Sequence, residues 1–116
     1  MPVRRTGRRY LGIQVVGQRR FTDKEVVDAV QKGVLRLYGI MGLSQIEPAL
    51  IDFDEEEQRG ILRCSRDHLR RMRAVLALTT EVSGSAAAVH VEMVSGTIKA
   101  LRSKLGVLPG EETPNR

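Results

Sequence analysis

Residues 52–65 read Asp-Phe-Asp-Glu-Glu-Glu-Gln-Arg-Gly-Ile-Leu-Arg-Cys-Ser and specify how the middle of the chain folds. The acidic run 54–58 is a polar turn between two β-type segments, which predicts a hairpin with strands at 45–53 and 59–64. Pro48 marks an edge position or a bulge in the first of these strands. Ser65 is a good N-cap, so we expect the chain to enter a helix directly after the hairpin.

Upstream of the hairpin, the sequence predicts a strand followed by a helix. Residues 10–16 alternate apolar side chains in the manner of a strand, and Gly17 to Phe21 turns the chain. Thr22-Asp-Lys-Glu25 is a capping box. Apolar residues then recur at helical spacing, namely Val26, Val27, Val30, Val34 and Leu37. We expect Gly39 and Gly42 to end this helix.

Downstream, a second helix begins after Ser65, with Leu69, Met72 and Leu76 facing inward. Its Arg66, Arg70 and Arg73 follow one another at i, i+4 and i+7, which places a basic stripe along one face. Residues 82–85 interrupt the chain before a fourth strand at 86–94. A third helix is predicted over 98–105.

This element order, β-α-β-β-α-β with a terminal helix, is typical of an α+β, ferredoxin-like (split βαβ) fold. It predicts a four-stranded antiparallel sheet with two helices on one face, the other face free, and a C-terminal helix. The length of 116 residues suits a single domain. We expect that domain to span 1–105 and to be followed by a flexible tail, 106–116.

The charge of the chain is concentrated in blocks. Nineteen bases oppose 14 acids, for a net charge of +5, and arginine outnumbers lysine fifteen to four. The blocks are residues 1–20, 59–73 and the last helix, which favours a polyanionic partner. A single cysteine, Cys64, excludes an intramolecular disulfide. With neither a signal peptide nor an apolar run of membrane-spanning length, we expect a cytoplasmic protein without membrane association.

Aromatic side chains are scarce, and this limits how RNA could be bound. The chain has only Tyr10, Phe21, Tyr38 and Phe53. Recognition of unpaired bases by stacking needs rings on the central strands, and the 59–64 strand has none. Binding of structured RNA through its shape and phosphates stays open.

The sequence offers no convincing catalytic site. Cys64 and His68 are four residues apart, but without a third orienting group they are better read as a buried thiol and a surface histidine. His90-Val-Glu92 lacks the downstream cysteine pair of zinc deaminases. The acidic turn 54–57 lacks the glycine and the terminal glutamate of a calcium loop, although casual magnesium binding there stays open. We therefore expect no catalytic residue, no bound metal and no cofactor in this chain.

Ser95-Gly96-Thr97 leads directly into the basic third helix, which carries Lys99 and Arg102. A helix N-terminus with free amide groups and nearby bases can bind an anion. The alternative is an ordinary Ser or Thr N-cap on an amphipathic helix, and both interpretations stay open.

Several motifs resemble the archaeal ribonuclease P protein component 2 family, over about residues 3–105. They are 52–54, 58–65, 73–78 and 94–101, supported by 8–11 and 35–39. Arg-Gly-Ile-Leu-Arg-Cys at 59–64 and Val-Ser-Gly-Thr-Ile-Lys at 94–99 are together fairly specific. The matching motif positions, which are candidates for RNA contact or for shaping the fold, are Arg59, Gly60, Arg63, Cys64, Ser65, Ser95, Gly96, Thr97 and Lys99.

The resemblance implies a subunit of the archaeal ribonucleoprotein that removes 5′ leaders from precursor tRNA. It implies that the ribonuclease P RNA does the chemistry with Mg²⁺ and that precursor tRNA is met indirectly. It also implies pairing with the barrel-shaped component 3, with two copies of each protein in a heterotetramer.

Our first hypothesis is therefore an RNA-binding accessory subunit of ribonuclease P. The candidate RNA-binding residues are Arg8, Arg9, Arg63, Arg66, Arg70, Arg73, Ser95, Gly96, Thr97, Lys99 and Arg102. The alternative is a ferredoxin-like regulatory or dimerisation module that binds a small anion at residues 95–97. A stand-alone phosphate-ester or acyl-phosphate hydrolase is the third.

Overall fold

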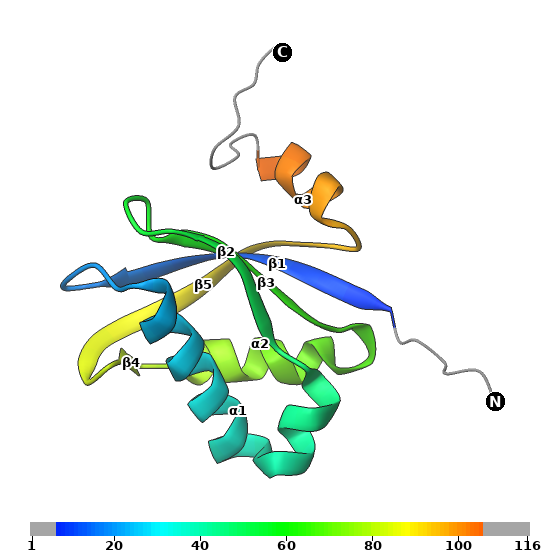
Figure 1. The fold of residues 1–116 in the computed structure, drawn as a ribbon, viewed down its shortest axis with the longest axis horizontal. Coiled ribbons are helices and arrows are strands. Elements are labelled where there is room, and N and C mark those ends of the chain that lie inside the picture. Colours follow the sequence, from blue (N-terminus) through cyan, green and yellow to red (C-terminus); the bar gives the residue numbers. More distant parts are fainter. Residues whose placement is uncertain (1–6, 106–116) are drawn as a thin grey trace.

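A computed structural model describes residues 7–105 of the chain. In chain order the elements are β1 (Arg8–Gly17), α1 (Asp23–Ile46), β2 (Ala49–Asp54), β3 (Arg59–Ser65), the 3₁₀ turn η1 (Arg66–His68), α2 (Leu69–Leu78), β4 (Glu81–Val82), β5 (Ser85–Ser95) and α3 (Ile98–Leu105). Figure 1 shows this arrangement, and it confirms the predicted α+β class. The predicted tail, 106–116, lies outside the described residues.

The strands form one antiparallel sheet in the order β2-β3-β1-β5-β4. The prediction of four strands was therefore one short, because Glu81 and Val82 add a fifth strand that pairs with Ala86 and Ser85. Ser83 and Gly84 form the connecting turn with φ values of 50° and 78°. A strand of two residues shows no alternation, so the pattern of residues 82–85 indicated only a break.

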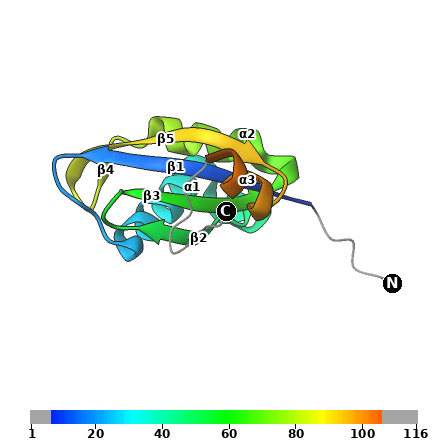
Figure 2. The same ribbon diagram turned by 90° about the horizontal axis from the view of Figure 1, so that it is seen from above.

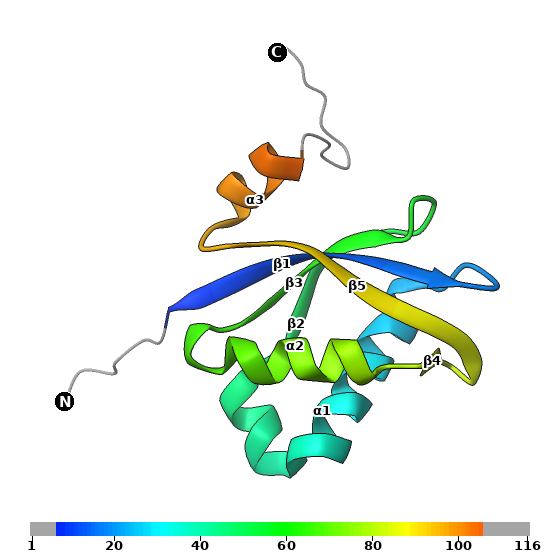
Figure 3. The same ribbon diagram turned by 180° about the vertical axis from the view of Figure 1, so that it is seen from behind.

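The helices lie on both faces of the sheet. α1 and α2 pack against one face, and α3 lies on the opposite face (Figures 1 and 3). We had expected the second face to be free, but α3 covers part of it and buries Leu101 completely. Leu101 is apolar and would lose a favourable burial worth about 2 kcal/mol if the helix stood in solvent.

The main core lies between the sheet and the pair α1 and α2. It contains many of the side chains that the sequence patterns placed inward, together with Leu62 and Val75; the buried members include Leu11, Ile13, Val15, Val26, Val30, Val34, Cys64, Met72 and Leu76. Leu37 was predicted to face inward, but it is 42% exposed.

α1 begins as predicted and is interrupted at Gly39, with a second helical segment after it. The Thr22 hydroxyl accepts a hydrogen bond from the Glu25 N–H (3.2 Å), and the Glu25 carboxylate accepts one from the Thr22 N–H (2.9 Å). A hydrogen bond from Arg19, above all, lowers the pKa of Glu25 to about 2. The helical conformation is interrupted at Gly39, as predicted, where φ is 73° and ψ is −173°. Glycine adopts this left-handed conformation without strain, and a second helical segment follows it to Ile46.

The chain enters β2 and α2 later than the sequence indicated. The last turn of α1 occupies residues 43–46, so β2 begins at Ala49 and not at 45. Ser65 precedes the 3₁₀ turn η1, its side chain caps no helix, and α2 starts at Leu69. The Ser65 side chain is buried at the end of β3, which removes it from the role of an N-cap.

Gln58 joins the β2–β3 turn to the loop between β1 and α1. Its side-chain amide accepts a hydrogen bond from the Phe21 N–H and donates one to the Phe21 carbonyl, both at 3.0 Å. The carboxylate of Asp54 accepts hydrogen bonds from the N–H groups of Glu56 and Glu57. Glu55 accepts one from the N–H of Asp23. Side chains of the acidic turn are therefore used to hold the turn itself and the start of α1.

Gly60 lies where β3 passes close to β2, and this position predicts a stability effect. A Cβ added there would be 2.5 Å from the Asp52 carbonyl oxygen and 2.8 Å from the Phe53 ring. Because backbone blocks this space, Gly60→Ala should lower the free energy of unfolding by about 1–3 kcal/mol in urea denaturation. Gly96→Ala is the matched control. Its Cβ would meet nothing nearer than 3.7 Å, and equal stability of the two variants would contradict this packing.

Candidate nucleic-acid interface

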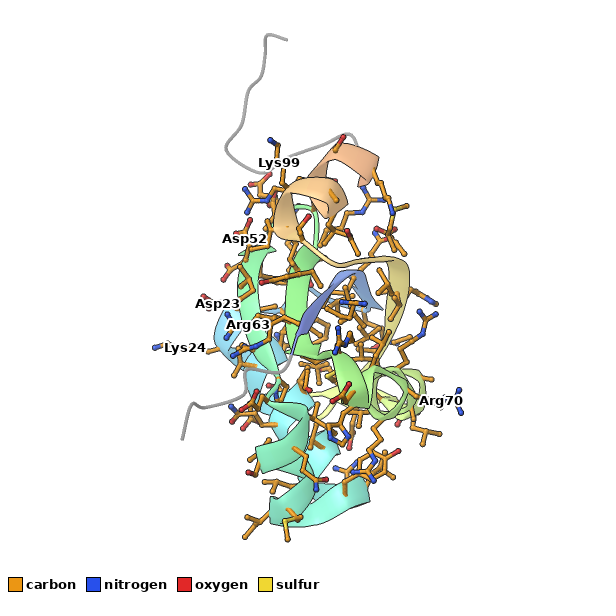
Figure 4. The ribbon with its side chains drawn as sticks, turned by 90° about the vertical axis from the view of Figure 1, so that its right-hand side faces the viewer. Asp23, Lys24, Asp52, Arg63, Arg70 and Lys99 are labelled. Atoms are coloured by element: carbon orange, nitrogen blue, oxygen red, sulfur yellow. The ribbon has the colours of Figure 1, made fainter. Side chains whose placement is uncertain are left out.

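The antiparallel sheet brings three separate motifs to one end of the molecule. The start of β1 lies beside the end of β3, with Arg8 opposite Ser65 and Arg9 opposite Cys64. On its other side, Tyr10 of β1 is opposite Ser95 at the end of β5. We use the name basic end for this region, which consists of Arg8, Arg9, Arg63, Arg66, the loop 95–97 and Lys99 at the start of α3. Figure 4 views the molecule from this end.

Contacts within the basic end fix two of its arginines. The Arg9 guanidinium donates a hydrogen bond to the Arg8 carbonyl (3.0 Å) and lies beside the 95–97 loop, where it is the nearest group to the open side of Gly96. The Arg66 N–H donates to the Gly7 carbonyl at 2.8 Å, and the Arg66 guanidinium lies over Gly7. Arg9 is thus held against its own strand beside the 95–97 loop, and Arg66 is held against the residue that precedes β1.

The charge of the basic end is largely uncompensated. Within residues 7–105, Arg8, Arg9, Arg63 and Lys99 form no ion pair. Arg66 has Asp67 at 3.7 Å, an exposed contact that is worth little in water. Nε of Arg63 is buried and has no hydrogen-bond partner among the described residues. A group of arginines with so few carboxylate partners is suited to bind phosphates, which arginine contacts through two parallel hydrogen bonds.

The other candidates lie elsewhere. Arg70 and Arg73 are on α2, beside a groove between α2 and β5. In Figure 4, Arg70 lies on the opposite side of the view from Arg63. Arg102 reaches over the sheet to Asp52, with Nη2 and Oδ2 at 3.5 Å. The structure therefore divides the predicted site residues among the basic end, the α2–β5 groove and an ion pair under α3.

The 95–97 loop uses its hydroxyl groups to begin α3. The Thr97 hydroxyl accepts a hydrogen bond from the Ala100 N–H (3.0 Å), which is the arrangement of an N-cap. The Ser95 hydroxyl is buried and accepts a longer bond from the Thr97 N–H (3.4 Å). These contacts favour the N-cap interpretation that the sequence left open. Anion binding by this loop stays a prediction.

Cys64 is a core side chain, as predicted. It is fully buried between the sheet and the helices, and this burial raises the pKa of its thiol to about 11, against a smaller lowering by Arg9. His68 is partly exposed in η1. A thiol that stays protonated at neutral pH is a poor nucleophile, so this pair offers no catalytic centre.

The sequence did not predict a cavity on the face of the sheet that α3 covers. A cavity of about 460 Å³ lies beneath α3 and beside the β2–β3 turn. Side chains of both charges line it, including Asp52, Asp54, Glu57, Arg59, Arg102 and Lys104. Only the packing of α3 onto the sheet creates this space, and no sequence pattern signals it. In the described part of the chain, no three His, Cys, Asp or Glu side chains are grouped to hold a metal ion.

Together, a small α+β domain and a largely uncompensated group of arginines are the features expected of a protein class that binds a polyanion. The chain belongs to the Rpp14/Pop5 family, whose sequence profile matches residues 9–106. This membership confirms the resemblance drawn from the motifs. Between residues 7 and 105, no helix is both long and apolar enough to cross a membrane.

Curated relatives and a solved structure agree with this assignment. The chain is 40% identical over 103 residues to ribonuclease P protein component 2 of Thermococcus gammatolerans, covering 89% of this chain and 86% of that one. The same protein of Pyrococcus furiosus is 37% identical with the same coverage. A chain in the cryo-EM structure of yeast ribonuclease MRP superposes with a TM-score of 0.66, over 90% of this chain and 95% of that one. At 13% identity, this last match supports the fold alone.

The burial of Cys64 predicts how the thiol reacts. In the folded protein, a thiol-specific reagent such as dithionitrobenzoate should modify Cys64 only at the rate of unfolding. The reagent cannot reach the buried side chain, and the thiol is not in its reactive thiolate form. In denaturant the single thiol should react fully within the mixing time. Rapid reaction of the native protein at neutral pH would contradict the placement of Cys64 in the core.

Proposed function

We infer that this chain is a protein subunit of ribonuclease P, which binds the RNA of that enzyme and supports its removal of 5′ leaders from precursor tRNA. The observation that carries the inference is the basic end. It occurs in a member of the Rpp14/Pop5 family whose curated relatives include ribonuclease P protein component 2 of two archaea. The sheet places arginines from β1, β3 and η1 at one end, where the one ion pair among the described residues is the exposed contact of Arg66 with Asp67.

The mechanism is electrostatic. A folded RNA packs phosphates closely, and each bound arginine removes part of their mutual repulsion and releases counterions. At the basic end, the phosphates are neutralised by Arg8, Arg9, Arg63 and Arg66. Lys99 extends this positive surface along α3. The scarcity of aromatic side chains fits contacts to phosphate and shape better than base stacking. On this proposal the RNA supplies the chemistry together with Mg²⁺, and the protein binds no cofactor of its own.

The proposal also names the protein partner of this subunit. The subunit pairs with component 3, two copies of each forming a heterotetramer, in the cytoplasm of an archaeon. The second part of α1, after the bend at Gly39, supports a protein-binding surface. Ile40 and Met41 are 80% and 71% exposed there, and neighbouring exposed apolar side chains are typical of such surfaces.

The proposal also includes the finer description of the fold as ferredoxin-like. When β4 is set aside, the strands lie in the order β2-β3-β1-β5 with α1 and α2 on one face. This arrangement supports a split β-α-β layout, to which β4 adds a short edge strand.

Reconstitution tests the function directly. Ribonuclease P RNA should be combined with component 3, with and without this protein, and precursor tRNA cleavage followed as Mg²⁺ is lowered. We expect this protein to extend activity to lower Mg²⁺, because its arginines replace part of the charge neutralisation that the ion provides. Cleavage that is unchanged at every protein concentration would contradict the assignment.

The salt dependence of RNA binding tests the site. Arg9→Gln and Arg63→Gln should each weaken binding to ribonuclease P RNA and reduce the slope of log K against log salt by about 1. Arg20→Gln is the matched control, because Arg20 is an exposed arginine in the loop after β1, at the far end of the sheet. If the control reduced the slope as much as the other two variants, the basic end would not be the contact surface.

A further inference from the structure

The outer edge of β5 lacks a neighbouring strand over most of its length. One edge of β5 pairs with β1 over Ala87–Ser95. On the other edge, β4 pairs only with Ser85 and Ala86. From Ala88 to Val94, no strand within residues 7–105 pairs with this edge. In Figure 2, β5 is the outermost long strand on the side where α2 lies.

A groove of about 550 Å³ runs between this edge and α2. Four consecutive residues of β5, Ala88 to Val91, line it. Successive side chains of a strand point to opposite faces, so a groove that touches four in a row faces the edge of the strand and its backbone. The opposite wall is α2, from Arg70 to Thr79.

The lining combines small apolar side chains with positive charge. Ala74 and Ala77 of α2 and Ala88 of β5 leave space, while Leu76 and Val89 form an apolar floor. Arg70, Arg73 and His90 are exposed members of the lining, which contains no carboxylate. Neither Arg70 nor Arg73 forms an ion pair with a described residue.

We propose that the β5 edge and the α2 groove bind an extended, acidic polypeptide segment of a partner protein, which adds a strand to the sheet. The backbone of such a segment would pair with the free N–H and C=O groups of β5. Every second side chain would face the groove, where apolar ones would cover the floor and carboxylates would meet the guanidinium groups of Arg70 and Arg73. This surface is separate from the basic end and goes beyond the proposed function.

The charge of the lining favours this occupant over the other candidates. A second copy of the chain, pairing edge to edge, would bring two sets of these arginines toward each other. The positive charge would also attract single-stranded RNA, but RNA phosphates would not bury the apolar floor or pair with the backbone N–H and C=O groups of β5. An extended peptide with carboxylates uses all three features.

The test uses the full chain, labelled with ¹⁵N, and the capped peptide Glu-Thr-Val-Thr-Val-Thr-Glu, whose glutamates and valines share one face of an extended strand. We expect saturable binding, with shift changes confined to α2 and residues 88–94 and slower hydrogen exchange of the outward N–H groups of β5. The same peptide with N-methylated valines should bind at least about tenfold more weakly, because it cannot complete the strand pairing. Ala77→Trp, which fills the groove from an exposed position, should abolish binding and leave the melting temperature unchanged.

The double variant Arg70→Glu with Arg73→Glu tests the charge without touching the core, and Arg20→Glu is its control. Only the double variant should weaken binding, by about tenfold or more. Several results would overturn the proposal: no saturable binding up to about 1 mM, equal binding of the N-methylated peptide, or displacement of the peptide from the groove by heptauridylate at lower concentration. Protection of the β5 edge by concentration-dependent dimerisation without peptide would instead assign the edge to a second copy.

Discussion

The pairing of β1 with β3 on one side and β5 on the other is the constraint on which the rest of the structure depends. Both neighbours run antiparallel to β1, so its first residues must lie beside the last residues of each. Residues near positions 8, 65 and 95 therefore meet at one end of the sheet. The same pairing determines where η1 and α3 begin, since these elements follow β3 and β5 directly.

Packing and hydrogen bonds hold this pairing in register. Leu11 of β1 and Leu62 of β3 are opposite each other and fully buried under the helices. A slip of one residue would turn them to the other face and bring neighbouring polar side chains into the core. At the far end, Gln58 binds the backbone of Phe21 and its own carbonyl accepts from the N–H of Val15. The register of the strands is thus held at both ends of the sheet, and this register fixes where the residues of the basic end lie.

Local patterns predicted much of the fold because they are local in origin. The capping box at Thr22, the helical spacing of the valines in α1 and the β2–β3 hairpin each depend on residues a few positions apart. Features that depend on tertiary packing escaped prediction. The helix is interrupted at Gly39 as predicted, but the further helical segment up to the buried Ile46 was not predicted. α3 packs onto the sheet through Leu101, which the pattern marks as apolar without saying what it meets.

The candidate site, too, was predicted only in its local features. The sequence identified arginine-rich blocks but not their partners, and an arginine is available to RNA only if no carboxylate holds it. Arg102 belongs to a predicted block and is paired with Asp52 across the sheet. Arg8, Arg9 and Arg63 are free of such pairs among the described residues. Arg102 and Asp52 are 50 positions apart in the chain, so only the fold could reveal this difference.

Directed cleavage of the RNA tests the central claim most directly. Because Cys64 is buried, an iron–EDTA reagent can be attached to a single new cysteine, either Gly96→Cys at the basic end or Arg20→Cys at the far end of the sheet. In the assembled complex, we predict that radicals from position 96 cut the ribonuclease P RNA at a few defined places and that those from position 20 do not. Equal cutting from both positions, or cutting from position 20 alone, would contradict the account.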